Sequence, residues 1–96
     1  MTSRKTLSEL VQEGGTPDEI IATFAYYADR GTAISGRSVS AIVAQVQWQP
    51  QQLDAAYASL ERGLRNAVLD GKSRDAGDYL YAMDAVEKAM RRAANP

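Results

Sequence analysis

Apolar residues recur at helical spacing through the middle of the chain, and this pattern limits the fold more than any other feature of the sequence. Residues three, four and seven positions apart share one face of an α-helix. Two such sets flank the corner Trp48-Gln49-Pro50 and predict two amphipathic helices that pack together by their apolar faces. The first set is Val39, Ile42, Val43 and Val46, and the second is Leu53, Ala56, Tyr57, Leu60 and Leu64.

Capping sequences predict two helices before this pair. Thr6-Leu7-Ser8-Glu9 and Thr16-Pro17-Asp18-Glu19 both place a glutamate three residues after a threonine. This is the spacing of a capping box, in which each side chain satisfies a free backbone N–H of the first turn. Glycines then follow at positions where a helix can end. The expected helices span residues 7–13 and 17–30.

Two further boundaries follow from the same kind of evidence. Ser38 is the expected cap of the helix that carries the first apolar set, which runs to about Gln47, and Pro50 opens the next helix. A last helix is expected over residues 76–94, where Leu80, Met83, Val86 and Met90 are among the apolar residues. Asp75 and Asp78 have the character of its cap and first-turn residues.

The segment between Leu64 and Leu80 leaves two alternatives open. Asp70-Gly71 is a hairpin sequence when strands flank it, which predicts a short β-wing over residues 65–81. Alternatively, the helix that starts at Pro50 continues through Gly63 to Asp70, since a glycine inside a helix costs only about 1 kcal/mol. In the second case residues 51–70 and 76–94 form a helical hairpin.

The absence of cysteine and histidine narrows the chemistry open to the chain. Disulfides and thiolate nucleophiles are excluded, and the usual zinc ligands and the commonest general base are missing. The acidic loop 70–78 does not fit a calcium-binding loop, because Lys72 and Arg74 occupy ligand positions. We therefore expect a protein that is not an enzyme and that binds no cofactor and no metal ion.

The charge balance and hydropathy limit the partners. A net charge of −1 and a pI of about 5.3 argue against a non-specific nucleic-acid coat, which needs a basic surplus. A local basic patch remains compatible with a specific DNA reader. No segment approaches the ~18 apolar residues of a membrane span, and the start MTSRKTLSEL lacks the apolar core of a signal peptide. We expect no membrane association and a cytoplasmic location.

The segment SVSAIVAQVQWQPQQLDAAYASLERGL resembles the winged-helix family of DNA-binding domains over residues 17–81. In that family a supporting helix and a short turn lead into a recognition helix, and a Leu-Glu-x-x-Gly-Leu-like sequence opens the wing. The resemblance implies a mainly α fold: one small domain over residues 1–96, with a tri-helical helix-turn-helix core, a β-wing and a C-terminal helix. It implies a DNA-binding transcriptional regulator that is dimeric through the last helix.

Candidate contacts to double-stranded DNA follow from the outward face of the second helix of the pair. Glutamine can pair with adenine, and small side chains fit beside a thymine methyl group. Arginine and lysine can bind the phosphate backbone, two of them from the wing. The predicted DNA-binding residues are Arg37, Gln51, Gln52, Ala55, Ser59, Arg62, Arg65, Lys72 and Arg74.

A non-enzymatic protein-binding module, such as a small inhibitor or adaptor built on a helical bundle, is the alternative. It is favoured by the acidic pI and by the few charges on the helix that follows Pro50. The candidate partner-binding residues are Trp48, Tyr79 and Tyr81. Trp48 is interpreted first as a cover over the edge of the core. Tyr79 and Tyr81 cannot both face inward on one helix, so one of them is expected at the surface.

Overall fold

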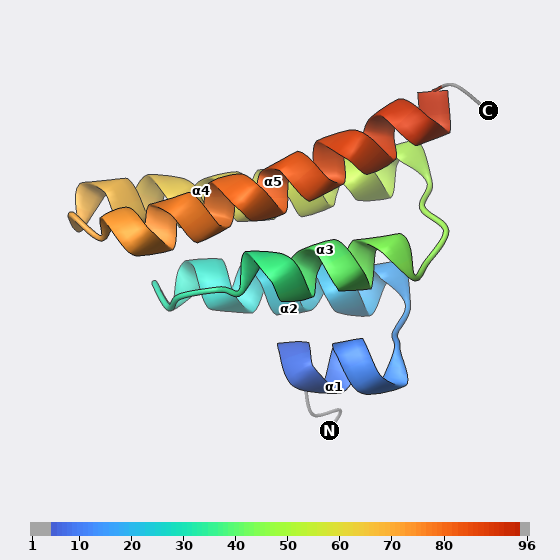
Figure 1. Cartoon of the computed structure of the whole chain (residues 1–96), viewed down its shortest axis with the longest axis horizontal. Coiled ribbons are helices and arrows are strands. Elements are labelled where there is room, and N and C mark those ends of the chain that lie inside the picture. Colours follow the sequence, from blue (N-terminus) through green and yellow to red (C-terminus); the bar gives the residue numbers. More distant parts are fainter. Residues whose placement is uncertain (1–4, 95–96) are drawn as a thin grey trace.

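Five α-helices make up residues 5–94, the part of the chain that the computed structural model describes (Figure 1). They are α1 (Leu7–Glu13), α2 (Pro17–Asp29), α3 (Gly36–Ala44), α4 (Pro50–Leu69) and α5 (Ser73–Ala94). α4 and α5 form a long hairpin, α2 packs against α4, α3 packs against α5, and α1 contacts α3. The extents of 39 × 35 × 20 Å describe a slab two helices thick. The prediction of a mainly helical domain is confirmed.

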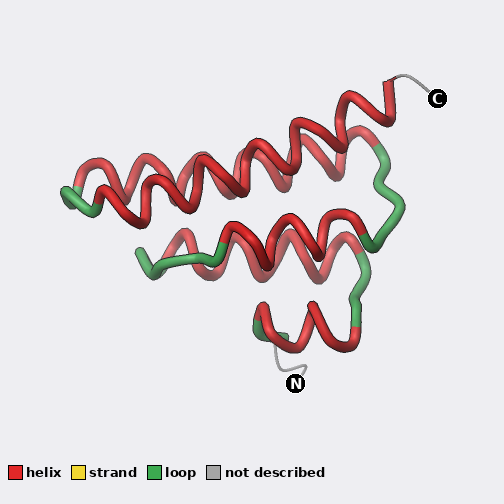
Figure 2. The backbone as a smooth tube through the Cα atoms, viewed as in Figure 1, coloured by secondary structure: helices red, strands yellow, loops and turns green. Residues whose placement is uncertain are grey.

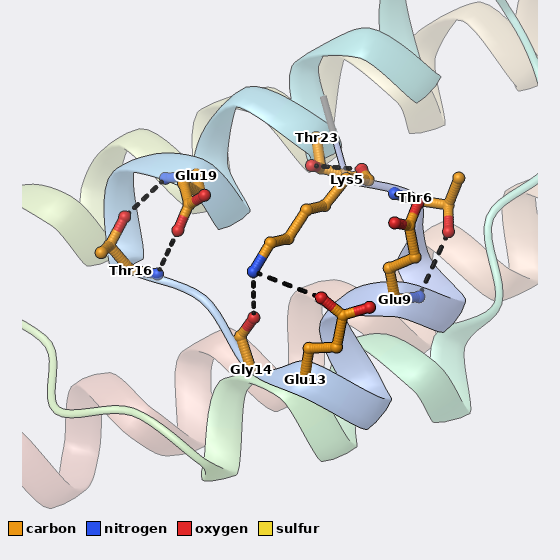
Figure 3. A network of polar contacts seen from close by, with 8 residues as sticks. All are labelled: Lys5, Thr6, Glu9, Glu13, Gly14, Thr16, Glu19 and Thr23. Atoms are coloured by element: carbon orange, nitrogen blue, oxygen red, sulfur yellow. Dashed lines mark hydrogen bonds and ion pairs between the residues drawn. The ribbon is translucent and has the colours of Figure 1, made fainter. Parts of the chain in front are cut away.

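The first two helices begin where their capping boxes predict (Figure 3). The Thr6 hydroxyl accepts a hydrogen bond from the Glu9 N–H at 3.2 Å, and the Glu9 carboxylate accepts from the Thr6 N–H at 3.1 Å. Thr16 and Glu19 repeat this exchange at 3.2 and 2.9 Å. The hydrogen bond from the Thr16 backbone lowers the pKa of Glu19. α2 ends at Asp29, one residue earlier than expected.

Lys5 holds α1 in place at both of its ends (Figure 3). Its ammonium donates to the Gly14 carbonyl at 3.0 Å and lies 3.9 Å from the Glu13 carboxylate. The Thr23 hydroxyl, buried in α2, donates to the Lys5 carbonyl at 3.1 Å. Leu7 and Leu10 complete the attachment by entering the core. The short α1 is therefore fixed by tertiary contacts, which a helix of two turns requires.

The predicted β-wing is wrong, because residues 65–81 are helical apart from a tight turn (Figure 2). Gly71 has φ +71°, and its N–H donates to the Val68 carbonyl while the Lys72 N–H donates to the Ala67 carbonyl. These two bonds form a Schellman motif, a common way to end a helix. Asp70-Gly71 therefore ends α4, and the helical hairpin is the alternative that the structure contains.

α4 continues through Gly63, and the missing side chain at this position lets α5 approach closely. The ring of Tyr79 lies against Gly63, and a methyl group at this position would overlap with that ring. The Tyr79 hydroxyl reaches past α4 and donates to the Thr32 carbonyl at 2.9 Å. The glycine that the sequence offers as a helix end instead serves the packing of two helices.

The two apolar sets face one core, as predicted. Val39, Ile42, Val43, Leu53 and Leu60 are buried in it, and Val46, Trp48, Tyr57 and Leu64 pack at its edge. The predicted tri-helical helix-turn-helix core is nevertheless not confirmed. α3 packs mainly against α5, whereas α4 packs against α5 and α2.

Three predicted capping roles are wrong. Ser35, and not Ser38, caps α3, because the Ser35 hydroxyl accepts from the Ser38 N–H at 3.2 Å. α3 also ends at Ala44 and does not reach Gln47. α5 begins at Ser73, so Asp75 lies in its first turn and does not cap it, and Asp78 lies further along the helix. The Asp78 carboxylate instead accepts from the Gly36 N–H at 3.4 Å, so it caps α3 from a different helix.

Candidate protein-binding hollow

The α3–α4 loop passes the last turns of α5 at one end of the slab (Figure 1). Residues of this loop, α3, α4 and α5 line an open hollow of about 580 Å³. We call it the Trp48 hollow. Its volume falls in the range of ligand and peptide sites, and seven of its nine lining residues are apolar. The lining residues are Val43, Ala44, Val46, Gln47, Trp48, Leu53, Ala89, Arg92 and Ala93.

Local hydrogen bonds fix the loop that forms one wall of this hollow. The Trp48 indole N–H donates to the Val43 carbonyl at 3.0 Å, which holds the ring over the edge of the core. The expectation that Trp48 covers the core is confirmed. The Gln49 N–H donates to the Gln52 side chain at 2.9 Å, and the Gln51 amide donates to the Gln49 side chain at 2.8 Å. These hydrogen bonds lie within the chain, so the loop keeps this conformation without a bound partner.

Arg92 is the charged residue among those that line the Trp48 hollow. It lies exposed in the last turn of α5, where a cation suits the helix dipole. It forms no ion pair with any residue between 5 and 94. A guanidinium beside an apolar hollow is suited to a ligand that joins an apolar group to a carboxylate.

A second, smaller hollow of about 240 Å³ lies on the other flank of α5. It shares Leu53 and Ala93 with the Trp48 hollow, so the last turns of α5 stand between the two. Asp54 lines the smaller hollow, whereas Arg92 lines the larger one. The two hollows therefore have opposite charges at their rims, and only the Trp48 hollow favours an acidic ligand.

The predicted DNA-binding residues do not gather on one surface. Gln51 and Gln52 lie in the first turn of α4, and Lys72 and Arg74 lie beyond its other end. A helix of 20 residues separates them by roughly 30 Å. The predicted outward position of Ser59 is wrong, because Ser59 is buried and donates to the Ala55 carbonyl at 3.1 Å.

The predicted basic contacts on α4 are engaged with neighbouring acids. Arg62 lies 3.4 Å from Asp29, and Arg65 lies 3.5 Å from Glu61. Both pairs are exposed, so they hold the side chains only weakly. Ala55 is exposed between them and the glutamines.

Arg37 lies in the first turn of α3, while Lys72 and Arg74 lie at the α4–α5 turn. Gly36, its neighbour, packs against Tyr81, and the Lys72 ammonium donates to the Gly31 carbonyl at 3.4 Å. Four carboxylates occupy the same end of the molecule and offset these cations: Asp29, Asp70, Asp75 and Asp78.

The two tyrosines of α5 divide as predicted, with one inside and one outside. Tyr79 is 1% exposed, and burial raises its pKa to about 12. It is thus not available as the partner contact that the sequence suggested. Tyr81 is 54% exposed and lies over Gly36 of α3.

Sequence reasoning missed Arg92 as part of a site. Its position beside Trp48 depends on the hairpin, which brings the end of α5 next to the start of α4. A sequence signal existed, because two helices of similar length joined by a three-residue turn run antiparallel along their whole length. Because the sequence left both a β-wing and a helical hairpin possible for residues 65–81, the position of Arg92 beside Trp48 could not be predicted.

Comparisons with protein-family models, curated proteins and solved structures find no match for this chain. No helix between residues 5 and 94 combines the length and the hydropathy that crossing a membrane requires. Within the same residues, no three acidic side chains are placed to share a metal ion. The geometry of the chain itself is therefore the basis of the functional proposal.

Proposed function

We propose that this protein is a non-enzymatic protein-binding module that holds a short apolar and acidic segment of a partner in the Trp48 hollow. The observation that carries the proposal is the apolar hollow of about 580 Å³ with Arg92 at its rim. Arg92 is free of ion pairs with residues 5–94. Trp48 and Arg92 belong to the residue types that most often dominate binding energy at protein interfaces.

Two features of the hollow support a peptide segment as the ligand. It is open to solvent, which suits a chain that enters and leaves. Its apolar lining comes from α3, the α3–α4 loop, α4 and α5, so a bound segment would contact every element at this end of the molecule. Because these walls are already formed, little ordering of the protein is needed on binding.

Selection from a random peptide library tests the proposal without knowledge of the natural partner. The immobilised full chain is expected to enrich peptides that combine apolar residues with aspartate or glutamate. Trp48 is the single tryptophan of the chain, so its fluorescence reports binding directly. Failure to enrich any common pattern, or binding that leaves Trp48 fluorescence unchanged, would contradict the proposal.

A charge reversal provides the matched control. Arg92→Glu should reduce the affinity of the selected peptides at least about tenfold, because it removes the only cation of the lining and introduces repulsion. Arg74→Glu makes the same change on α5 at the opposite end of the molecule and should leave the affinity unchanged. Equal losses in the two variants would show a non-specific effect of charge.

Duplex DNA is the second candidate ligand, favoured by Lys72 and Arg74, which lie within three residues of one another at the α4–α5 turn. Nearby carboxylates weaken this surface, and residues 65–81 form no wing from which Lys72 and Arg74 could reach phosphates. A DNA reader should bind mixed duplex DNA at low salt, weaken steeply as salt rises, and lose affinity in Arg37→Ala and Arg74→Ala. No retention at low salt would remove this candidate.

A further inference from the structure

A second surface of the molecule carries the three most exposed large apolar side chains among residues 5–94. Val68, Leu69 and Leu80 are 62%, 78% and 55% exposed, respectively. A shallow hollow of about 310 Å³ lies between Leu64, Val68, Leu69 and the charged pair Glu61 and Arg65. We call Leu64, Val68, Leu69 and Leu80 the Val68 face. Clustered exposure of large apolar side chains commonly marks an interaction surface.

Helical spacing places Leu64, Val68 and Leu80 on one flank of the hairpin. The Tyr57 hydroxyl donates to the Glu87 carboxylate at 2.9 Å and so identifies this flank on both helices. Leu64 follows Tyr57 by seven residues, and Leu80 precedes Glu87 by seven, so each pair shares a face. The antiparallel register then sets Leu80 level with Leu64. Leu69 extends the apolar area around α4.

The charges along this flank occur in a fixed order. Glu61 precedes Arg65 by one turn at 3.5 Å on α4, and Asp84 precedes Lys88 by one turn at 3.2 Å on α5. The two pairs offset each other, and Glu87 of the same flank adds one negative charge, so a strongly acidic or basic partner gains little from this surface. On each helix the acidic residue comes before the basic one in the sequence, and this order is complementary to one kind of partner. A second helix with the same order, lying antiparallel, brings each acid opposite a base.

We propose that the Val68 face binds a second copy of this chain in a two-fold dimer, with α4 antiparallel to α4 of the other copy. Two-fold symmetry presents the same patch from both sides, so the patch must be complementary to itself. In this arrangement Glu61 lies opposite Arg65 of the second copy, and Val68 and Leu69 lie level with Ala58 and Tyr57 of the second copy. The proposal goes beyond the peptide-binding function, because its surface is separate from the Trp48 hollow.

Sedimentation equilibrium of the full chain from micromolar to millimolar concentration tests the dimer. Self-association should be reversible, and Val68→Glu and Leu80→Glu should each weaken it at least about tenfold. Both positions are exposed, so both variants should keep the helical circular dichroism of the parent. A monomer at every concentration, or an unchanged dimer in both variants, overturns the proposal.

Exchanging the charges tests the antiparallel arrangement itself. Glu61→Arg and Arg65→Glu should each self-associate more weakly, because like charges then meet across the two-fold axis. An equimolar mixture of the two variants should associate at least as strongly as the parent, since the mixed dimer pairs opposite charges. A mixture no stronger than either variant alone overturns the arrangement. Peptide binding in the Trp48 hollow should persist in the monomeric variants, which separates failure of this proposal from failure of the proposed function.

Discussion

The two ends of the slab are held together in different ways. At the turn end, which comprises residues 28–36 and 62–81, side chains cross between helices far apart in the sequence. The Asn66 amide donates to the Ala28 carbonyl at 3.1 Å, and the Tyr79 hydroxyl donates to the Thr32 carbonyl at 2.9 Å. At the open end, which comprises residues 43–53 and 89–94, the bonds of Trp48 and Gln49 are local and a hollow separates the elements.

This difference explains how a small helical domain can be stable at one end and bind a partner at the other. The polar bonds at the turn end satisfy carbonyls that the ends of α2 and its loop leave free, so Ala28 and Tyr79 are fully buried between the helices. The open end instead leaves apolar side chains partly uncovered, and those side chains are available to a partner. Stability should therefore depend mainly on the turn end, and binding mainly on the open end.

Replacing Tyr79 should have the largest effect on stability. Tyr79→Ala removes a fully buried ring from between α4 and the α2–α3 loop and should cost about 3–5 kcal/mol. Tyr79→Phe keeps the ring and loses one hydrogen bond, so it should cost about 1 kcal/mol. Urea unfolding followed by circular dichroism measures both values. Equal, small losses would show that the ring is not packed as described.

Replacing Trp48 should affect stability less and binding more. The ring is only half-buried, so Trp48→Ala should cost about 1–2 kcal/mol of unfolding free energy. The same variant should lose measurable affinity for the selected peptides, which isothermal titration calorimetry can follow. A variant that unfolds more easily but binds the peptides normally would reverse the roles assigned to the two ends.

Two amide side chains allow a matched comparison of the ends. Asn66→Ala removes the bond to the Ala28 carbonyl and should cost about 1 kcal/mol. Gln45→Ala removes an exposed bond of 3.4 Å to the Val11 carbonyl and should cost less than about 0.5 kcal/mol. Thermal melts of the two variants give the ranking. A greater loss in Gln45→Ala would contradict the account of the turn end.

Alkaline pH should weaken the turn end with little effect near neutrality. Burial raises the pKa of folded Tyr79 to about 12, whereas an unfolded tyrosine titrates near 10. The stabilisation from protonated Tyr79 is therefore complete below about pH 10 and is lost as pH rises toward 12. Tyr79→Phe should remove this part of the pH dependence. The hydrogen bond to Glu87 also raises the pKa of Tyr57. Tyr57→Phe should therefore remove a separate part of the pH dependence and leave the part that comes from Tyr79.

The sequence predicts the parts of the fold that depend on local chemistry. The starts of α1, α2 and α4 follow from capping boxes and proline, and the apolar faces of α3 and α4 follow from spacing. The end of α4 could not be predicted with the same certainty, because Asp70-Gly71 suits a hairpin turn and a Schellman motif equally. The choice depends on Tyr79 packing against Gly63, a contact between residues 16 positions apart.

The candidate site was predictable only in part for a related reason. Trp48 could be identified because it stands directly before Gln49-Pro50, at the corner between the two apolar sets. Arg92 could not, since its place beside Trp48 exists only once α5 has folded back along α4. Ser59 was misplaced because a helix packed on two sides buries a wider arc than one packed on a single side, and α4 contacts both α2 and α5.

The most direct test of the account is the amide and indole NMR spectrum of the labelled protein during titration with a selected acidic peptide. The account predicts that the single indole N–H signal, from Trp48, and the amides of residues 43–53 and 89–94 move most, while residues 62–81 stay in place. The largest changes at residues 62–81, with the Trp48 indole signal unmoved, would contradict it.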